Sequence, residues 1–367
     1  MKVKKLSLYN FRNVASAEIS FSDEMNFLLG DNAQGKTNAL EAIYLFARGK
    51  SFRGATDGEL TRFGEKGYAV TLSFEKKDRE ETLFCSYTKK EKVRKRNGVL
   101  LEKQSELLGS FRAVLFSPDD LMMIKGSPAE RRRFLDVAIA QCYPAYLSLY
   151  AGYLKHLEQR NALLKQMKDG YYDPTSLEVW NEALSGSAAD IYFYRKEYVD
   201  RLGGIAASLM GELSRGREEM RLSYDSNIRE NEDDREAVRE RYRHLFSAHT
   251  DREVMMGTTL FGVHRDELTV TIGKKAARDY GSQGQQRSAV LALKMAEGAL
   301  SREICGESPV YLFDDVLSEL DEERRAFLLS GMKGCQFIVT GCERSVLGAH
   351  GDRVHFIKVK DGGFTEA

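Results

Sequence analysis

The sequence predicts an α/β fold that is interrupted by a long helical insertion, and three observations support this prediction. An apolar strand, a glycine-rich loop and a helix follow one another near the start of the chain. From Pro128 to about residue 255 the apolar pattern is helical. A second apolar strand, which ends in two acids, comes later. We therefore expect an α/β head made of residues 1–125 and 256–367, with an inserted helical arm lobe at residues 126–255.

The glycine-rich loop fits the phosphate-binding pattern G-x-x-x-x-G-K-[ST] and reads Gly30-Asp31-Asn32-Ala33-Gln34-Gly35-Lys36-Thr37. The glycines let backbone N–H groups point at phosphates, and the N-terminus of the following helix adds positive potential. In this pattern Lys36 contacts the β- and γ-phosphates, and Thr37 offers its hydroxyl to Mg²⁺. The alternative is a chance glycine-rich turn, which the flanking strand and helix disfavour.

Composition bounds the class of protein. The chain has 367 residues, of which 42% are hydrophobic and 30% charged, enough for one large or two ordinary domains. No run of about eighteen apolar residues and no signal peptide is present, so we expect a cytosolic protein. The five cysteines form no C-x-x-C pair, which favours reduced thiols. Because 55 basic residues balance 55 acidic ones, any DNA-binding surface must be local.

The first part of the head is expected to be rich in strands. Alternation predicts strands on both sides of the loop and its helix, at residues 3–9, 17–21, 68–74, 82–87 and 93–101, with a hairpin turn at Asn97-Gly98. Residues 89–96 carry six basic side chains and one acid. A strand would place four of the six on one face, namely Lys90, Lys92, Arg94 and Arg96. Such a face either contacts DNA phosphates or uses its charges to prevent unwanted strand pairing.

The insertion is expected to form a short antiparallel coiled-coil arm. Pro128 suits a first helical turn, and Pro144 a kink or restart. Apolar positions then alternate by three and four, at Leu147, Tyr150, Leu154, Leu157, Asn161 and Leu164. A second helix repeats this spacing at Leu177, Trp180, Leu184, Ser187 and Ile191. Helices of about thirty residues give an arm of roughly 45 Å. We expect Gly203-Gly204 to break the second helix and the charged residues 227–243 to be helix or loop.

The second part of the head returns near residue 256 and supplies acids to the site. A glycine- and glutamine-rich loop at 280–287 opens a helix at 288–300. The strand 310–313 ends in Asp314 and Asp315, as in the second half of a P-loop site. We expect Asp314 to bind Mg²⁺ and Asp315 to orient or activate the attacking water. A buried strand at 335–340 and a hairpin at 353–364 complete the chain.

Several segments resemble ABC-type ATPase heads and, more narrowly, the bacterial RecF family. The ABC resemblance rests on the phosphate loop, on Ser282-Gln283-Gly284-Gln285, and on Asp314-Asp315 followed by Ser318-Glu319-Leu320-Asp321. The RecF resemblance keeps its order along the whole chain, at residues 10–13, 30–37, 116–121, 126–136, 159–161, 264–266, 282–287 and 314–321. The chain departs from that family at Val263, where proline is usual, and at Gly341-Cys342-Glu343, where a threonine-rich run is expected.

The resemblance implies an ATP-dependent, DNA-binding protein of recombinational repair, replication restart and the SOS response. An ATP-bound homodimer would clamp double-stranded DNA near single-strand gaps, hydrolyse ATP slowly, and assist the RecO and RecR mediators in loading recombinase.

The resemblance also implies a role for each site residue. The phosphate loop would bind ATP, with Lys36 and Asp315 catalytic and Thr37 and Asp314 on Mg²⁺. Ser282, with Gly284 and Gln285, would contact the γ-phosphate that the partner subunit holds. The remaining expectations are an adenine contact for Arg12, a γ-phosphate sensor at Thr340, a hydrogen-bonded loop histidine at His264, and either DNA contacts or salt bridges for Arg131, Arg132 and Arg133. The resemblance favours the DNA interpretation of the basic strand.

Three other functions compete. A chromosome-structuring or break-repair ATPase would need a far longer coiled coil or an apical zinc hook, and this chain has neither in its sequence. The nucleotide-binding subunit of a membrane transporter would need a compact helical insert in place of a heptad arm. A binding module in which ATP only locks a clamp remains open, since Asp315, in place of the glutamate of faster ABC ATPases, is compatible with slow hydrolysis.

Overall fold

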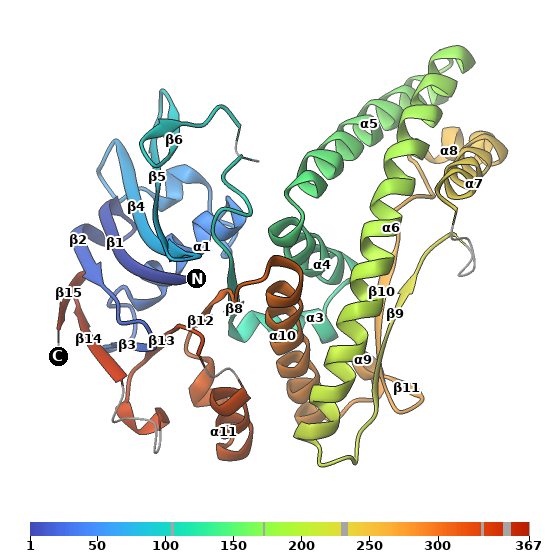
Figure 1. Cartoon of the computed structure of the whole chain (residues 1–367). Helices are drawn as coiled ribbons and strands as arrows, with labels where there is room; N and C mark the ends of the chain where they lie inside the picture. Colours follow the sequence, from blue (N-terminus) through green and yellow to red (C-terminus); the bar gives the residue numbers. More distant parts are fainter. Residues whose placement is uncertain (104–105, 172, 229–233, 332–333, 348–353, 367) are drawn as a thin grey trace. The chain divides into compact units, whose positions relative to one another are not determined.

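The computed structural model describes residues 1–367 except 104–105, 172, 229–233, 332–333, 348–353 and 367 (Figure 1). The chain divides into two compact units. Unit 1 comprises Met1–Leu121, Leu209–Gly216 and Arg287–Ala367, and unit 2 comprises Met122–Ser208 and Arg217–Gln286. Residues 256–286, which we had assigned to the head, thus belong to the same unit as the arm.

Unit 1 contains a six-stranded antiparallel sheet in the order β2-β1-β4-β5-β6-β7. Its strands are β1 Lys2–Phe11, β2 Val14–Ser20, β4 Gly67–Lys76, β5 Arg79–Thr88, β6 Lys92–Arg96 and β7 Val99–Leu100. These strands confirm the sequence prediction, including the turn at Asn97 and Gly98, whose φ angles are 50° and 81°. Along β4, alternate residues such as Val70, Leu72 and Phe74 are buried, as the period of two requires.

The second sheet of unit 1 is mainly parallel and has the order β15-β14-β3-β13-β12-β8. Its strands are β3 Met25–Leu29, β8 Ala113–Phe116, β12 Val310–Phe313, β13 Phe337–Gly341, β14 Val354–Lys360 and β15 Gly363–Glu366. Strands β8 and β12 are buried along their whole length, as expected where both faces of a parallel sheet are covered. Strands β14 and β15 confirm the closing hairpin, although Arg353 lies outside the described residues.

Helices cover both faces of the parallel sheet. Helix α1 Lys36–Arg48 packs between the two sheets, where ten of its thirteen residues are buried. Helix α11 Glu322–Gly331 and the part of α10 Gln283–Cys305 that belongs to unit 1 pack against the other face, through Leu291, Met295, Leu328 and Leu329. Short helical segments, α2 Asp57–Leu60 and the 3₁₀ turns Pro118–Leu121 and Val316–Glu319, lie in the connections.

Unit 2 is mostly helical. Its helices are α3 Met122–Lys125, α4 Pro128–Cys142, α5 Pro144–Lys168, α6 Pro174–Leu213, α7 Arg235–Ala248, α8 Thr250–Met256 and α9 Ala277–Tyr280, of which α6 ends in unit 1. A small antiparallel sheet has the order β11-β10-β9, with β9 Met220–Asp225, β10 Glu267–Ile272 and β11 Lys275–Ala276. No sequence pattern had led us to expect strand β9. None of the helices in the described part of the chain is long and apolar enough to cross a membrane.

Helices α5 and α6 are antiparallel, as predicted (Figure 1), but the expected seam on α5 is confirmed only at Leu164. Leu164 is fully buried, as predicted, but Leu154 is 42% exposed. The other fully buried positions are Tyr146, Tyr153 and Arg160, one heptad apart and one residue before the predicted Leu147, Leu154 and Asn161. Arg160 takes an interior position because Asn181, Glu253 and Thr259 satisfy its guanidinium. The seven-residue repeat was therefore present, but its buried positions include Tyr146, Tyr153 and Arg160, which are only partly apolar.

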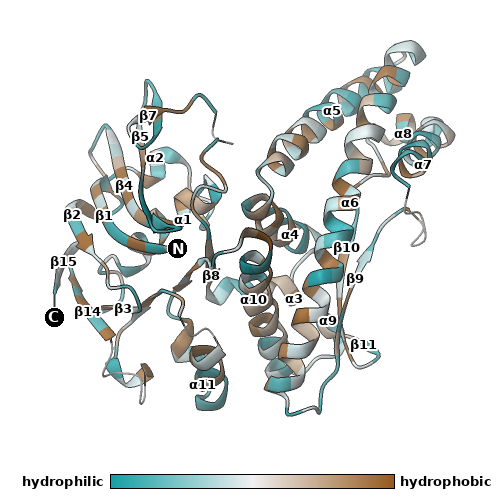
Figure 2. Cartoon of the chain, viewed as in Figure 1, coloured by the Kyte–Doolittle hydropathy of each residue, from teal (hydrophilic) through white to brown (hydrophobic). Residues whose placement is uncertain are grey.

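The seam on α6 is confirmed at Leu177, Leu184 and Ile191, all buried. Figure 2 shows hydrophilic and hydrophobic residues interleaved along this helix. The break expected at Gly203-Gly204 is wrong, because α6 runs through both glycines to Leu213. Gly203 lies against Leu222 of β9, 3.5 Å from where a Cβ would stand, and buried neighbours such as Leu202 and Ala206 hold the helix in place. Tertiary packing here outweighs the low helix propensity of glycine.

Candidate nucleotide-binding site

The carboxyl ends of three parallel strands bring the predicted site residues together. In the register of the sheet, Leu29 of β3 pairs with Gly341 of β13, and Phe313 of β12 pairs with Val339 of β13. The segments that leave these strands therefore emerge at one edge. They are the phosphate loop, residue 342, and the acids at 314–315. The order of the strands thus brings together segments that lie almost three hundred residues apart in sequence. Sites at this edge are usual for open parallel sheets.

Two glycines give the phosphate loop its shape. Gly35, which precedes α1, has a φ of 116°, a conformation that other residues rarely adopt. At Gly30 a Cβ would lie 2.3 Å from the carbonyl oxygen of Val359, so only glycine fits beside β14. The loop is also held from the C-terminal hairpin, where the backbone N–H of Asp361 donates to Gln34 Oε1 at 2.6 Å.

The predicted phosphate lysine is buried within its own loop. Lys36 is 3% exposed, and its Nζ donates to the carbonyl oxygens of Gly30 and Asp31 at 2.6 and 3.0 Å. Its Nζ also lies 3.4 Å from Cys342 Sγ, at one of the two positions where the chain departs from the RecF pattern. No carboxylate pairs with this ammonium group among the ion pairs of the described residues. The positive charge therefore remains available to an anionic ligand.

Thr37 and Asp314 meet directly, although they are far apart in sequence. Thr37 Oγ1 donates to Asp314 Oδ1 at 2.6 Å, and Thr340 Oγ1 donates to the same oxygen at 3.2 Å. Burial raises the pKa of Asp314, and the hydrogen bond from Thr37 opposes that rise. A hydroxyl and a carboxylate at this spacing are the two protein ligands that a P-loop site offers to Mg²⁺.

Thr340 and Asp315 adjoin this pair. The Asp315 backbone N–H donates to Thr340 Oγ1 at 2.9 Å, and Asp315 itself has a φ of 55°. The hydroxyl of Thr340 is thus engaged with the two acids, and the role of γ-phosphate sensor stays a prediction. Asp315 lines the cavity described below, where a residue that orients water must lie.

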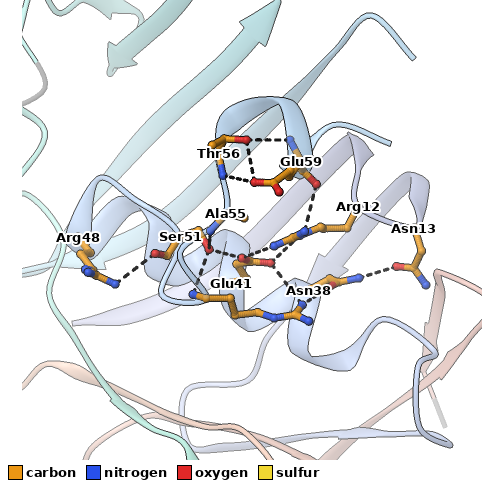
Figure 3. A network of polar contacts seen from close by, with 10 residues as sticks. Arg12, Asn13, Asn38, Glu41, Arg48, Ser51, Ala55, Thr56 and Glu59 are labelled. Carbon is orange, nitrogen blue, oxygen red and sulfur yellow. Dashed lines mark hydrogen bonds and ion pairs between the residues drawn. The ribbon is translucent and has the colours of Figure 1, made fainter. Parts of the chain in front are cut away.

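Arg12 is tied to the body of unit 1 (Figure 3). Its Nε and Nη2 donate to both oxygens of Glu41 at 2.9 and 2.8 Å, and its Nη1 donates to the carbonyl oxygen of Glu59. Glu41 is fully buried on α1 and also accepts from Ser51 Oγ at 2.5 Å. Three N–H groups of Arg12 therefore hold α1 to the segment around α2. The adenine contact predicted for Arg12 would use the two that remain.

A cavity of about 1100 Å³ connects these residues. Residues 32–37 of the phosphate loop, Arg12 and Asp315 line one part of it, and residues 58–59 and 61–65 line another. Sequence reasoning missed three residues here: Glu41, Arg53 and Phe63. Arg53 is 47% exposed, with Nη1 3.3 Å from Asn38 Oδ1. The helical period of α1 does not indicate a role for Glu41, since a charged residue in a helix is usually solvated. Its position close to the phosphate loop in sequence could nevertheless have indicated one.

The predicted signature loop lies in unit 2, at the N-terminus of α10. Ser282 and Gln285 cap this helix reciprocally, since the Ser282 N–H donates to Gln285 Oε1 at 2.8 Å and the Gln285 N–H donates to Ser282 Oγ at 3.2 Å. Gly281 must be glycine, because a Cβ would lie 2.6 Å from the carbonyl oxygen of Ala277. The loop thus presents the positive end of a 23-residue helix, a good place for an anion.

The basic strand is partly neutralised by one acid of α2 and one of the neighbouring strand β5. Lys92 pairs with Asp57 at 2.6 Å, and Arg96 pairs with Glu81 at 2.8 Å. Lys90 is exposed at the turn before β6, and Arg94 is half-buried on the strand. Both interpretations of this strand, a DNA contact and a protected edge, are therefore compatible with its surroundings.

The arginines at the start of α4 differ in their exposure. Arg131 is 6% exposed and contacts both oxygens of Glu267, while Arg132 donates to the carbonyl oxygen of Asp266. Arg133 remains half exposed, 3.8 Å from Glu130. His264 accepts or donates in a 2.6 Å hydrogen bond with Tyr153, and burial lowers the pKa of His264 to about 4. It is a partly buried, hydrogen-bonded loop histidine, as expected.

The fold and the phosphate-loop site are those of an ABC-type ATPase head. The chain belongs to the RecF/RecN/SMC N terminal domain family, which matches residues 2–365, and within it to the RecF proteins. It is 40% identical over 333 residues to the DNA replication and repair protein RecF of an Exiguobacterium species, a match that covers 90% of both chains. To the protein of the same name in Ruminiclostridium cellulolyticum it is 38% identical over 346 residues, or 93% of this chain and 92% of the relative.

Solved structures agree. A structure described as the recombination mediator protein RecF-ATP in the RecFOR pathway superposes with a TM-score of 0.93 at 33% identity, covering 100% of this chain and 97% of the other. An Smc head domain from Pyrococcus furiosus has a TM-score of 0.58 at 21% identity, which shows a shared fold alone. The RecF resemblance inferred from the sequence is thus confirmed.

Proposed function

We propose that this protein is an ATP-dependent, double-stranded DNA-binding protein of recombinational repair and replication restart. ATP binding would join two copies into a clamp on duplex DNA near single-strand gaps. Slow, DNA-stimulated hydrolysis of ATP to ADP and phosphate would then open the clamp. The relatives named DNA replication and repair protein RecF support the repair role, and the similar RecF-ATP structure supports the nucleotide.

The observation that carries the proposal is the contact between Thr37 and Asp314 beside the buried Lys36. A hydroxyl and a carboxylate 2.6 Å apart, next to an ammonium group that has no ion-pair partner among the described residues, suit the Mg²⁺ complex of a nucleoside triphosphate. On this proposal the loop Gly30–Thr37 binds ATP, Thr37 and Asp314 bind Mg²⁺, and Asp315 orients water. The two oxygens that would hold the metal are already in place, so the ordering cost of the site is low.

Dimerisation is proposed from the position of Ser282, Gly284 and Gln285. These residues open α10, where N–H groups and the helix dipole favour a phosphate. Since the phosphate loop of the same chain has its own ligands for the nucleotide, we propose that the loop of α10 contacts the γ-phosphate bound by a second copy.

Duplex binding is proposed to use the exposed charges near the β5–β6 turn. Lys90 is exposed there, and Lys95 is exposed on β6 with its Nζ 5.8 Å from the centroid of the Phe84 ring. Lys92 and Arg96, which are ion-paired, would add less to phosphate binding because they would have to give up Asp57 and Glu81. The RecO and RecR mediators are proposed as partners because the similar RecF structures are of a recombination mediator protein in the RecFOR pathway.

The experiment is DNA binding by fluorescence anisotropy with ATP, with ADP and without nucleotide, together with light scattering for the oligomeric state. We expect ATP alone to give a dimer and tight binding that weakens steeply with salt. Lys36→Arg should lose ATP-dependent dimerisation and turnover while keeping its fold, and the exposed Lys50→Arg serves as the matched control. If wild-type protein stays monomeric with ATP, the clamp is refuted; if it dimerises without binding duplex, the DNA proposal alone fails.

The DNA face is tested separately by charge reversal. Lys90→Glu combined with Lys95→Glu should weaken duplex binding and reduce its salt dependence. Each phosphate contact contributes about 0.9 to the slope of log K against log salt concentration, so the loss of two contacts should lower the slope by about 1.8. Lys274→Glu combined with Lys275→Glu, two exposed charges in unit 2, controls for the change in net charge. Equal losses in both variants would point to a general electrostatic effect and against a DNA contact at this turn.

A further inference from the structure

One aromatic side chain in the nucleotide cavity is wholly unpacked. Phe63 is 101% exposed, whereas most phenylalanines of unit 1 are buried, as Phe27, Phe46 and Phe74 are. It is also the single aromatic residue in the lining of the cavity, as far as the structure describes that lining. A fully solvated phenyl ring is unfavourable on its own, because apolar surface is left in water. An exposed ring at the wall of a ligand cavity therefore calls for an explanation by its ligand.

A β-turn places this ring at the wall of the cavity. Residues 62–65 form a β-turn that is closed by the Glu65 N–H donating to the Arg62 carbonyl oxygen at 3.0 Å. Gly64, the third residue of the turn, has a φ of 85°, which type II turns require at that position. Phe63 thus occupies the second position, at the apex of the turn, where a side chain points away from the chain.

The turn is anchored to the same strands that support the phosphate loop. The Arg62 N–H donates to the carbonyl oxygen of Asn10 at 2.8 Å, and Thr61 forms a bridge with Phe11. The Arg12 N–H donates to the Leu60 carbonyl oxygen at 2.8 Å. These bonds hold the turn at the end of β1, which is linked to α1 through Arg12 and Glu41. The position of Phe63 relative to the phosphate loop is therefore fixed by the body of unit 1.

We propose that Phe63 is the platform on which the purine base of the bound nucleotide stacks, and that it recognises the base by its flat face and not by its hydrogen-bonding edge. This inference rests on the proposed nucleotide binding. The phosphate loop fixes the triphosphate in one part of the cavity, so the base extends toward the remaining wall. Phe63 supplies a flat apolar surface in that wall, and every nucleobase offers a matching π face.

Among the residues that the structure describes, the side chains next to Phe63 in sequence do not form a buried site for the edge of one particular base. The two remaining N–H groups of Arg12 can donate to a ring-nitrogen acceptor of either purine. The nearby Arg62 and Glu65 are about 40% exposed and face each other at 3.9 Å. Glu59 is used to cap α2, where it accepts from the Thr56 N–H and hydroxyl at 2.8 Å each. Strong discrimination between bases needs buried polar groups that the wrong base would leave unpaired. Exposed groups can turn to water instead, so adenine and guanine nucleotides are accepted with similar affinity.

The test compares Phe63→Ala and Phe63→Trp with the wild type, using Mg²⁺ complexes of ATP, GTP and inorganic tripolyphosphate. Tyr9→Ala is the control, because Tyr9 is an exposed aromatic residue of β1 that does not line the cavity. Binding is measured by isothermal titration calorimetry, and the melting temperature checks folding. Phe63→Ala should weaken ATP and GTP alike by roughly 5- to 150-fold, the range for one base stacked on one aromatic ring. Tripolyphosphate, which has no base, should bind all four proteins equally.

Phe63→Trp supplies a positive readout. A larger aromatic surface should keep nucleotide affinity at or above that of the wild type. The fluorescence of the new tryptophan should fall when ATP or GTP binds and stay unchanged with tripolyphosphate, measured against the signal of the single native Trp180.

Each outcome bears on a stated part of the inference. Unchanged ATP affinity in Phe63→Ala overturns the stacking platform, and so does an equal loss for tripolyphosphate. A wild-type preference of more than about tenfold for ATP over GTP overturns recognition by the flat face. If wild-type protein binds none of the three ligands, the proposed nucleotide function itself fails, which is distinct from the failure of Phe63.

Discussion

The ion pair between Arg12 and Glu41 should be a stabilising contact of unit 1, and its removal can be predicted in size. Arg12→Ala would leave the carboxylate of Glu41, which is 0% exposed, without its bidentate partner. Breaking a buried pair in this way costs about 3–5 kcal/mol. Glu41 keeps the hydroxyl of Ser51 at 2.5 Å and has Arg53 at 3.8 Å, so we expect the lower end, about 3 kcal/mol.

The assay is the thermal transition of unit 1 without nucleotide. For a unit of about 210 residues, each kcal/mol shifts the midpoint by roughly 2–4 °C, so Arg12→Ala should melt about 6–12 °C below wild type. Lys5→Ala is the matched control, because Lys5 pairs with Glu18 at 2.6 Å on the surface of the same sheet and should change little. In the double variant Arg12→Ala/Glu41→Gln no buried charge is stranded, and part of the loss should return.

The result also decides between two roles for Arg12. If Arg12→Ala weakens ATP binding but melts within about 2 °C of wild type, the buried-pair argument is wrong and Arg12 acts on the nucleotide alone. If the double variant melts lower still than Arg12→Ala, the loss does not come from a stranded carboxylate.

The remaining predictions concern the metal pair, the pH response and two glycines. Thr37→Val should abolish Mg²⁺-dependent stabilisation by ATP in a melting assay while leaving the apo protein folded; undiminished stabilisation would remove Thr37 from the metal site. Burial raises the folded-state pKa of Asp314, so the stability that this group contributes is present at low pH and lost as pH rises through that pKa. The stability of Asp314→Asn relative to the apo wild type should therefore increase as pH rises from about 4 to 7. A gap that stays constant with pH would contradict this assignment. Gly30→Ala should destabilise unit 1, since its Cβ would lie 2.3 Å from a backbone oxygen. Gly204→Ala should stabilise the protein by about 0.5–1 kcal/mol, because Gly204 lies in the interior of α6 and a Cβ there would meet nothing within 4 Å. The same melting assay checks the sign of both effects.

The sequence predicted the parts of the site whose chemistry is local. The phosphate loop, its strand and helix, and the acids after β12 are each encoded within a few residues, and all were found in place. The Asn97-Gly98 turn was predictable for the same reason. Because the periods of strand and helix differ, the division into sheets and helical lobe could also be inferred.

What the sequence did not reveal depends on contacts between distant segments. Glu41 is buried because Arg12 and Ser51 surround it, and no pattern within α1 distinguishes it from a solvated glutamate. The predicted α5 positions Leu154 and Asn161 were one residue late because the buried Arg160 is satisfied by Glu253, far along the chain. Gly203 and Gly204 looked like a break because propensity is local, whereas the packing of β9 against α6 is not.

The two parts of the proposed ATPase site differ in how ready they are for a phosphate. In unit 1, Thr37 already meets Asp314 and Lys36 is held among the carbonyls of its own loop, so ATP can enter a site whose ligands are ordered. In unit 2, the backbone N–H groups of Ser282 and Gln285 are used in a reciprocal cap, and a γ-phosphate would have to compete with those two bonds. A charge-assisted hydrogen bond is roughly twice as strong as a neutral one. Replacing the two bonds of the cap by bonds to a fully charged γ-phosphate is therefore favourable. On the proposed function, ATP therefore binds one subunit first and the loop of the second subunit afterwards, and loss of the γ-phosphate returns Ser282 and Gln285 to their cap and releases the dimer.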